Sequence, residues 1–355
     1  MIGKKFKIAL FSTPRVAVPP PKYGGTELIV YNLAESLVKK GHDVTVFATG
    51  DSHTSAKLEY ICKKSGYQMG LPPDKAPALL HCSYLFAKMK EQKFDIIHNH
   101  YGAWGLAFAS LLSTPIVTTY HGDFAADLRP EDFKYFVQLA GQTGFVSISH
   151  SQARNTPFKI NWVGNVYNGI DISKFDFKDK PKNYFAWMGR FAPSKGAKEA
   201  ILAARQAKVK LILAGRLSSF HPEEVSYFNQ EIKPLLDSRL VKYIGEINHQ
   251  KKVKLLKNAI GLLNPINWNE PFGLVMTESF ACGTPVIANQ CGSVPEIVID
   301  GETGFIAKTQ KDIVKAIQNI NEIDRRKCRA RAEKYFSADK MTVEYEKIYR
   351  QILKS

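Results

Sequence analysis

KIALFSTPRVAVPPPKYGGTELIVYNLAESLVKKGHDVTVFAT, residues 7–49, begins with a short apolar run and ends with an alternating one. Between them lies a segment whose apolar residues recur every three to four positions, so the stretch predicts a strand, a helix and a second strand. Further short apolar runs follow at 95–100, 115–121 and 144–149. Strands that alternate with helices favour an α/β fold with a mostly parallel, doubly wound sheet.

The pattern starts again in the second half of the chain. NYFAWMGR, residues 183–190, predicts a strand, and helical and strand-like segments alternate after it up to the strand PVIA at 285–288. The segment VYNGIDISKFDFKDKPKN between the two series has a glycine turn, charges and Pro181, as interdomain linkers do.

We therefore expect two Rossmann-like domains that face a central cleft, with ligands beyond the carboxyl ends of the strands. The predicted boundaries are a first domain at 1–168, a linker at 169–182, a second domain at 183–335, and a C-terminal helix at 336–355 that packs back on the first domain.

Length and composition agree with this organisation. The chain has 355 residues, which is more than one hydrophobic core usually fills, and it is 45% hydrophobic and 23% charged, as soluble enzymes are. No apolar run is long enough for a membrane span, and the N-terminal segment lacks the features of a signal peptide. The five cysteines are scattered, which favours reduced thiols. These features predict a cytoplasmic protein.

The formal net charge of +16 suggests anionic partners such as nucleotides, nucleic acid or an acidic membrane face. The densest basic run is Arg325-Arg326-Lys327 with Arg329 and Arg331, in a segment expected to be helical. Two interpretations are open: a solvated helix face, or a surface that docks to an anionic membrane.

Residues 267–288, NWNEPFGLVMTESFACGTPVIA, contain Glu270 and Glu278. With Pro271 at the first helical position, a helix is expected from Phe272 to Ala281. A rise of about 12 Å over eight helical residues fits poorly to the carboxyl separation of a glycosidase acid/base pair. The spacing suits two contacts on a long ligand, whereas the alternative is a pair of ordinary surface charges.

Two glycine-containing turns suit phosphate groups. WMGRFAPSKG carries Arg190 and Lys195 after the first strand of the second half, and two cations on one loop could clamp a diphosphate. In the first half, PPPKYGGTE places Gly24 and Gly25 directly before a helix, where backbone amides can meet a phosphate.

Taken in order, these motifs resemble those of glycosyltransferase family 4, the retaining nucleotide-sugar enzymes of the two-Rossmann GT-B architecture. The stretches that carry the resemblance run from about residue 12 to residue 307: PPKYGGTE, DIIHNHY, TYHGDF, SISHSQA, VYNGID, MGRFAPSKG, LAGR, YIGEI, NEPFGLVMTESFACGTPVIA and GSVPEIVIDGETGF.

The resemblance implies a role for each matching residue of the second half. Arg190 and Lys195 would hold the donor diphosphate, and Glu278 would bind the ribose hydroxyls. Glu270 would accept hydrogen bonds from hydroxyls of the transferred sugar. The amides near that sugar would be those of Phe272, Gly273 and Leu274, and the loops at Gly215 and at Gly245 to Ile247 would border the nucleoside.

In the first half, the resemblance implies that Gly24 and Gly25 lie against the phosphates and that His121 lies beside the sugar. For His121 the alternative is a structural histidine at a strand end, and a structural role is expected for His98 and His100. The chain departs from the family at Ser194, where many relatives carry an acidic residue, and it lacks a long acceptor-binding insertion. Residues 57–93 are a candidate for a membrane-docking helix or a plain surface helix.

The expected function is transfer of a hexosyl unit, with retention, from a nucleoside diphosphate sugar to a hydroxyl acceptor. A UDP-sugar is favoured, then a GDP-sugar, and the acceptor could be a saccharide, a lipid-linked sugar or a small molecule. No cofactor or metal is expected, since no DxD-type dyad stands at a strand end. A family-type front-side attack, with the leaving phosphate as base, is implied.

Other functions stay open or are disfavoured. A nucleotide-sugar epimerase and a non-catalytic nucleotide-binding protein are the alternatives. A nicotinamide dehydrogenase is disfavoured because no G-x-G-x-x-G follows the first strand of either half. Nucleic-acid binding is not expected, since no recognition helix or aromatic platform is apparent.

Overall fold

The computed structural model describes residues 4–22, 24–72, 75, 77–217, 220–237 and 239–354. It divides the chain into two compact units: the first comprises residues 1–169 together with 338–355, and the second comprises residues 170–337. No helix in the described ranges is both long and apolar enough to cross a lipid bilayer.

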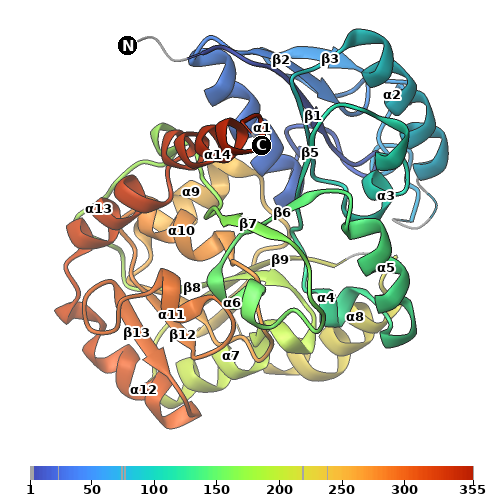
Figure 1. Cartoon of the computed structure of the whole chain (residues 1–355). Helices are drawn as coiled ribbons and strands as arrows, with labels where there is room; N and C mark the ends of the chain where they lie inside the picture. The colour runs from blue at the N-terminus through green and yellow to red at the C-terminus, as the bar shows by residue number, and fades with distance from the viewer. Residues whose placement is uncertain are drawn as a thin grey trace. The chain divides into compact units, whose positions relative to one another are not determined.

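The first unit is built on a parallel sheet (Figure 1). Its described strands are β1 (Lys7–Phe11), β2 (Asp43–Phe47), β3 (Lys57–Glu59), β4 (Ile96–Asn99), β5 (Ile116–Thr119), β6 (Gly144–Ser147) and β7 (Trp162–Asn165). Its described α-helices are α1 (Gly25–Lys39), α2 (Ala78–Gln92), α3 (Gly102–Leu106), α4 (Phe124–Asp127), α5 (Phe133–Ala140), α6 (His150–Arg154) and α14 (Ala338–Ile352).

The second unit has its own parallel sheet. Its described strands are β8 (Phe185–Arg190), β9 (Leu211–Arg216), β10 (Val241–Tyr243), β11 (Leu262–Asn264), β12 (Val286–Asn289) and β13 (Gly304–Ala307). Its described α-helices are α7 (Ala197–Gln206), α8 (Pro222–Tyr227), α9 (His249–Asn258), α10 (Leu274–Ala281), α11 (Val294–Ile297), α12 (Gln310–Asn319) and α13 (Arg325–Tyr335).

Both sheets follow the strand order of a doubly wound nucleotide-binding fold. The order is β3-β2-β1-β4-β5-β6-β7 in the first unit and β10-β9-β8-β11-β12-β13 in the second. The direction of winding reverses between β1 and β4, and again between β8 and β11. In such sheets ligands bind beyond the carboxyl ends of the strands at this switch point. The expected pair of Rossmann-like sheets is confirmed.

The last helix, α14, is part of the first unit. Ser36 Oγ of α1 donates to Asp339 Oδ1 at 3.0 Å, and His42 Nε2 lies 2.9 Å from Glu346 Oε1. Further along α14, the hydroxyl of Tyr349 lies 2.7 Å from His98 Nδ1 of β4. The C-terminal segment therefore completes the core of a sheet whose strands lie some 250 residues earlier in the chain.

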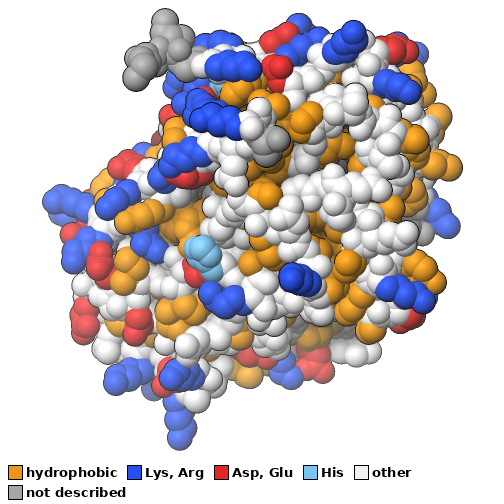
Figure 2. All heavy atoms as spheres, viewed as in Figure 1, with side chains coloured by type: hydrophobic (Ala, Val, Ile, Leu, Met, Phe, Trp, Pro, Cys, Tyr) orange, Lys and Arg blue, Asp and Glu red, His pale blue; other side chains and the backbone are white. Residues whose placement is uncertain are grey.

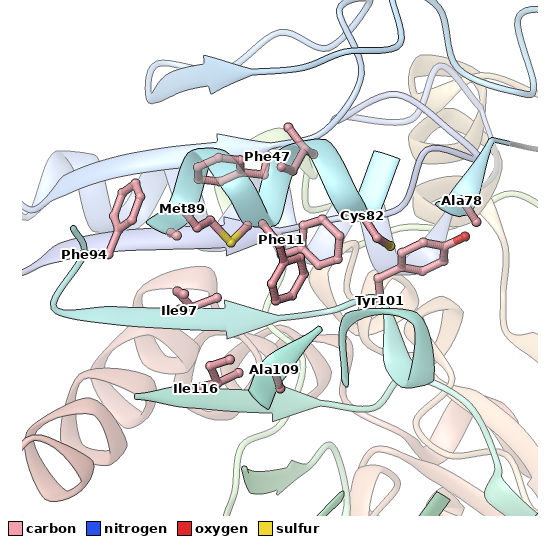
Figure 3. Close-up of a cluster of buried hydrophobic side chains, with 13 residues drawn as sticks. Phe11, Phe47, Ala78, Cys82, Met89, Phe94, Ile97, Tyr101, Ala109 and Ile116 are labelled. Carbon is pink, nitrogen blue, oxygen red and sulfur yellow. The ribbon is translucent and has the colours of Figure 1, made fainter. Parts of the chain in front are cut away.

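The prediction of one helix over residues 57–93 is wrong. Residues 57–59 form the edge strand β3, only residues 78–92 are helical, and Pro73, Asp74 and Ala76 lie outside the described residues. One face of α2 packs on the sheet, as Figure 3 shows for Cys82 and Met89 against Phe11 and Phe47. Lys57, Leu58 and Glu59 all pair with β2, so pairing with a neighbouring strand decides the structure of this segment against its helical pattern.

The expectation that the basic run at 325–331 forms a solvated helix face needs correction. The Arg325 guanidinium is buried and donates to the carbonyl oxygens of Lys178, Lys257 and Ala259 and to Thr284 Oγ1. Arg329 and Arg331 likewise donate to backbone carbonyls of the second unit. Three of the five basic side chains therefore bond to the backbone of loops and helix ends, and of these Arg325 is buried while Arg329 and Arg331 are half-buried.

The remaining positive charge is dispersed. On the face shown in Figure 2, Lys and Arg side chains are interspersed with acidic and hydrophobic ones. Arg326, next to the buried Arg325, is exposed and pairs with Asp179. The net charge is thus not gathered into one basic patch on that face.

Candidate active site

The candidate site lies at the switch point of the second sheet. It comprises the loop 191–196 after β8 and the loop 265–273 after β11, which we call the switch-point loops. The amide of Asn267 donates to the carbonyl of Ser194 at 3.0 Å, and Trp187 Nε1 donates to the carbonyl of Lys195 at 3.1 Å. These bonds hold the loop that contains Ser194 against β8 and the loop after β11.

Gly196 is required where the two switch-point loops meet. Its φ of +71° lies in the left-handed region, and a side chain there would collide with the carbonyl oxygen of Pro265. The glycine therefore lets the loop that carries Lys195 approach the loop that carries Glu270. Without this approach the two side chains could not meet.

Lys195, Trp268 and Glu270 form a compact group on these loops. Lys195 Nζ is paired with Glu270 Oε2 and lies 4.4 Å from the centre of the Trp268 ring, a cation–π contact. Trp268 Nε1 also donates to Glu270 Oε2, at 3.1 Å. Both charged side chains are 16% exposed, so the pair is partly desolvated and still open to a ligand. Trp268 was not predicted from the sequence.

The predicted start of the helix at Phe272 is wrong. Helix α10 begins at Leu274, after Gly273, which adopts a left-handed φ of +82°. Pro271 and Phe272 belong to the preceding loop because this turn redirects the chain. Glu270 therefore lies outside the helix, and the helical rise of about 12 Å does not describe its separation from Glu278. The predicted end of the helix before Gly283 is confirmed.

The loop around Glu270 is also held by the segment that follows β12. Gly292 has a φ of +52° and packs directly on the backbone of Glu270, which leaves no space for a side chain. The amide of Ser293 donates to the carbonyl of Glu270 at 3.0 Å, and its hydroxyl donates to the carbonyl of Phe272 at 2.7 Å. Phe272 itself is buried. The amides of Leu274 and Val275 have no partner within the helix, as at any helix start.

Glu278 is paired with Lys252 of α9. The Glu278 side chain is 6% exposed and that of Lys252 is 18% exposed. Sequence reasoning missed Lys252 because one lysine among the basic residues of KKVKLLKN carries no distinguishing signal. The pair joins α9 to α10 through two side chains that are mostly out of solvent.

Arg190 ends β8 and is paired with Glu224 of α8. In the parallel register Arg190 lies beside Arg216, the last residue of β9. The Glu224 side chain is 3% exposed, and its Oε2 has no partner among the described residues. Glu224 was not predicted, and its acidic helix-start position is a common one that gives no functional signal.

Gly215 and Ile247 lie at the same edge of the second sheet. Gly215 packs so closely against the carbonyl of Gly189 that no side chain fits, and its own carbonyl accepts from Tyr243 Oη at 3.0 Å. Ile247 is half-buried in the loop between β10 and α9. Most of the predicted residues of the second half thus lie at or just after the carboxyl ends of the neighbouring strands β8, β9, β10 and β11, whereas Glu278 lies within α10.

Gly24, Gly25 and His121 belong to the first unit. Gly24 precedes α1 and Gly25 is its first residue, while Pro20 lies close enough to Gly24 to leave little room for a side chain. Two residues further on, Glu27 is buried and accepts from Thr13 Oγ1 at 2.7 Å. Burial raises the pKa of this Glu27 carboxyl.

His121 follows β5, in a loop that Gln152 holds. Gln152 Nε2 donates to the carbonyls of Tyr120 and Gly122 at 2.9 and 2.8 Å. Burial lowers the pKa of His121 to about 4, so its imidazole is neutral near pH 7. Both ring nitrogens of His98 are hydrogen-bonded inside the first unit: Nδ1 lies 2.7 Å from Tyr349 Oη, and Nε2 lies 2.8 Å from Thr119 Oγ1. The structural role that the sequence predicts for His98 is therefore confirmed.

Comparison with known protein families shows to which family the chain belongs. The family model described as Glycosyl transferases group 1 matches residues 170–335, and the model described as Glycosyltransferase Family 4 matches residues 23–174. The chain belongs to glycosyltransferase family 4. It is therefore a glycosyltransferase, as the sequence motifs had indicated.

Curated relatives are distant but cover most of the chain. A D-inositol 3-phosphate glycosyltransferase of Arthrobacter sp. is 24% identical over 87% of this chain and 85% of its own length. An N-acetyl-alpha-D-glucosaminyl L-malate synthase of Bacillus anthracis is 24% identical over 94% of this chain and 96% of its own.

Solved structures share the fold. Sucrose-phosphate synthase of Thermosynechococcus elongatus superposes with a TM-score of 0.78 at 20% identity, covering 98% of this chain and 99% of that one. HepE of Anabaena, solved with UDP-glucose, gives a TM-score of 0.74 at 19% identity and covers 98% of this chain and all of that one. The GT-B fold of this family 4 chain is confirmed.

Proposed function

We propose that this glycosyltransferase moves a hexosyl unit from a nucleoside diphosphate sugar to a hydroxyl acceptor, with retention at the anomeric carbon. The observation that carries the proposal is the edge of the second sheet, where three cations, Arg190, Lys195 and Lys252, each pair with a carboxylate. Such an edge offers both charge for a diphosphate and acceptors for sugar and ribose hydroxyls.

The pairs suggest how a donor would bind. A diphosphate carries more charge than one carboxylate, so it competes with Glu270 for Lys195 and with Glu224 for Arg190. Glu270, once released from Lys195, would accept hydrogen bonds from hydroxyls of the transferred sugar. Glu278 would keep one oxygen on Lys252 and use the other for the ribose hydroxyls.

The chemical step would depend on stabilising the leaving group. When the sugar–phosphate bond breaks, negative charge grows on the diphosphate, and preorganised donors in a partly desolvated site stabilise it more than water does. Arg190, Lys195 and the amides at the start of α10 are the groups that would serve this purpose. We propose that these protein cations make a divalent metal unnecessary.

The base of the donor nucleotide and the class of the acceptor are supported by similarity alone. UDP-sugars are favoured because HepE was solved with UDP-glucose, and a GDP-sugar is the next choice. The relatives named for inositol phosphate and malate support a hydroxyl acceptor. A place in glycan, glycolipid or glycoconjugate synthesis, and a cytoplasmic location with peripheral contact to the inner membrane face, stay predictions.

The test begins with a thermal-shift screen of UDP, GDP and ADP, and of their sugars, against the full chain. We expect one diphosphate to raise the unfolding temperature, and its sugar to be turned over in the presence of EDTA. The anomeric configuration of the product, read by NMR, tests retention. No stabilisation by any of the three diphosphates would contradict the proposed donor class, and loss of turnover in EDTA would contradict metal independence.

A further inference from the structure

Two histidines of the first unit form a direct hydrogen bond. His100 follows β4, His121 follows the neighbouring strand β5, and His100 Nδ1 lies 2.9 Å from His121 Nε2. Their ring centres lie 5.2 Å apart and their planes differ by 21°, so the two rings lie edge to edge and nearly coplanar, as a hydrogen bond between ring nitrogens requires. A hydrogen bond between two imidazole nitrogens needs one proton, so one ring donates and the other accepts.

The surroundings of His100 decide which ring donates. His100 is 3% exposed, and its second nitrogen, Nε2, is buried without a partner among the described residues. If His100 carried its proton on Nε2, a buried N–H would have no acceptor. If the proton is on Nδ1, the N–H bonds to His121 and only a lone pair stays unpaired. Orphaned buried N–H groups are the rarer and costlier case.

Both rings are neutral, so each carries a single proton. Burial lowers the pKa of His121 to about 4, and burial together with the neighbouring His98 lowers the pKa of His100 well below its ordinary value. The His100 ring is held in place, since its amide donates to the carbonyl of Phe11 at 2.9 Å and its ring centre lies 3.9 Å from that of His98.

We infer that His100 is a positioning residue: it donates from Nδ1 to His121 Nε2 and thereby fixes His121 as the Nδ1–H tautomer. His121 then presents a hydrogen-bond donor at Nδ1, a nitrogen for which the described residues provide no partner. Such a group recognises an oxygen acceptor and cannot take a proton at that atom. This role adds to the structural one that the sequence predicts for His100.

The consequence for the reaction rests on the proposed function. If His121 lies beside the transferred sugar, it donates to a sugar oxygen and does not act as a general base. Its role would be to orient the donor, and the correct tautomer would be needed for each turnover. His100 would therefore join His121 among the residues of the first unit that the reaction needs.

The tautomer is tested by NMR on the full chain without ligand. Long-range correlations between ring nitrogens and ring protons distinguish a protonated from an unprotonated nitrogen, and His121→Gln assigns the signals. We expect Nδ1 of His121 to be protonated and Nε2 to be an acceptor at pH 7.5. A proton on Nε2 of His121 overturns the inference.

Two variants of His100 provide the functional arm. His100→Asn keeps an N–H donor near the Nδ1 position, whereas His100→Leu removes it. We expect His100→Leu to show mixed His121 tautomers and to lower kcat/KM by about tenfold or more, and His100→Asn to restore most of both. Equal loss in the two variants, with unfolding temperatures like the parent's, would contradict the positioning role.

The two claims fail separately. If the parent chain shows the expected tautomer but turns over no nucleotide sugar, the proposed function is wrong and the hydrogen-bond assignment stands. If transfer occurs while His121 carries its proton on Nε2, the assignment is wrong and the proposed function stands.

Discussion

Lys252 and Glu278 form an ion pair that is mostly out of solvent, and this makes each side chain dependent on the other. Breaking a buried pair leaves an uncompensated charge, which costs more than removing both partners. Glu278 was predicted as a ligand-binding residue, whereas its partner was found only in the structure. The function of the carboxylate and the stability of α9 and α10 are therefore linked at this pair.

We predict that Lys252→Met destabilises the chain by about 1 to 3 kcal/mol, because it leaves the Glu278 carboxylate unpaired. The double variant Lys252→Met/Glu278→Leu should recover part of that loss. Urea unfolding measures both, and Lys251→Met, an exposed neighbour on the same helix, is the control. Additive losses in the double variant would show that the two residues do not interact.

His81 illustrates how burial without a charge partner affects stability. It is fully buried and its Nε2 donates to the carbonyl of Ser12 at 3.0 Å, while burial lowers its pKa to about 4. The unfolded chain, with an ordinary histidine pKa near 6.5, binds more protons than the folded chain between pH 6.5 and 4. Stability is therefore lost as the pH falls through this window.

We predict that lowering the pH from 7.5 to 5 destabilises the chain by about 2 kcal/mol for each such histidine. His81→Gln, which keeps an N–H donor but does not titrate, should reduce this loss by about one histidine's share. The unfolding free energy at both pH values measures the effect, with the exposed His53→Gln as the control. The same pH dependence in all three chains would contradict the assignment.

At the scale of elements, the switch-point loops depend on glycine at one position of close approach. Gly196 and Gly301 have nearly the same left-handed φ, +71° and +72°, but only Gly196 has backbone against the position of a side chain. Gly301 has open space there. Substitution of each glycine by alanine therefore separates two costs in stability: that of an unfavourable φ, and that of displacing a loop.

We predict that Gly301→Ala costs about 1 kcal/mol of stability and leaves donor affinity unchanged, since it adds only backbone strain. Gly196→Ala should cost more and also weaken diphosphate binding, because Lys195 would move away from Glu270. Thermal unfolding and calorimetric titration of the diphosphate distinguish the two. Unchanged affinity in Gly196→Ala would mean that the loop position does not matter for binding.

Helix α13 shows where pattern reading fails. Its basic residues predict a solvated or membrane-facing surface, yet Arg325 donates to carbonyl groups of segments that precede it by more than 60 residues. No local pattern reports such partners. The regular strands and helices, by contrast, follow from local periodicity, and most of those expected were found. The same limit explains the mistaken helix at 57–93, because edge-strand pairing is also a tertiary contact.

We predict that Arg325→Met destabilises the chain by about 2 to 4 kcal/mol, since several buried carbonyl oxygens lose their donor. Arg326→Met, which removes an exposed ion pair one residue away, should change stability by less than about 1 kcal/mol. Urea unfolding of both variants makes the comparison. Losses of equal size would mean that burial of Arg325 is not what stabilises α13.

At the scale of the whole molecule, the strand order of the second sheet repeats that of the first six strands of the first sheet. Each unit therefore has a switch point, with loops beyond the carboxyl ends of its strands. The sequence predicted the fold class, which is confirmed. Its contiguous motifs also select Arg190, Lys195, Glu270 and Glu278 as donor-binding residues, and that assignment stays a prediction. The sequence did not predict Glu224, Lys252, Trp268 or Gly292, whose contacts depend on how distant loops meet. Contiguous motifs therefore select candidate ligand-binding residues, and the structure adds the partners that hold them.

The central claim is that Lys195 holds the diphosphate of the donor, and calorimetric titration with the best-bound nucleoside diphosphate tests it most directly. Lys198 is the matched control, since it lies three residues away and forms an exposed ion pair with Glu231. We predict that Lys195→Gln weakens binding by about tenfold or more, a loss typical of a hydrogen bond to a charged group, and that Lys198→Gln leaves the affinity within about twofold of the parent's. Equal affinity in the parent and in Lys195→Gln would contradict the account.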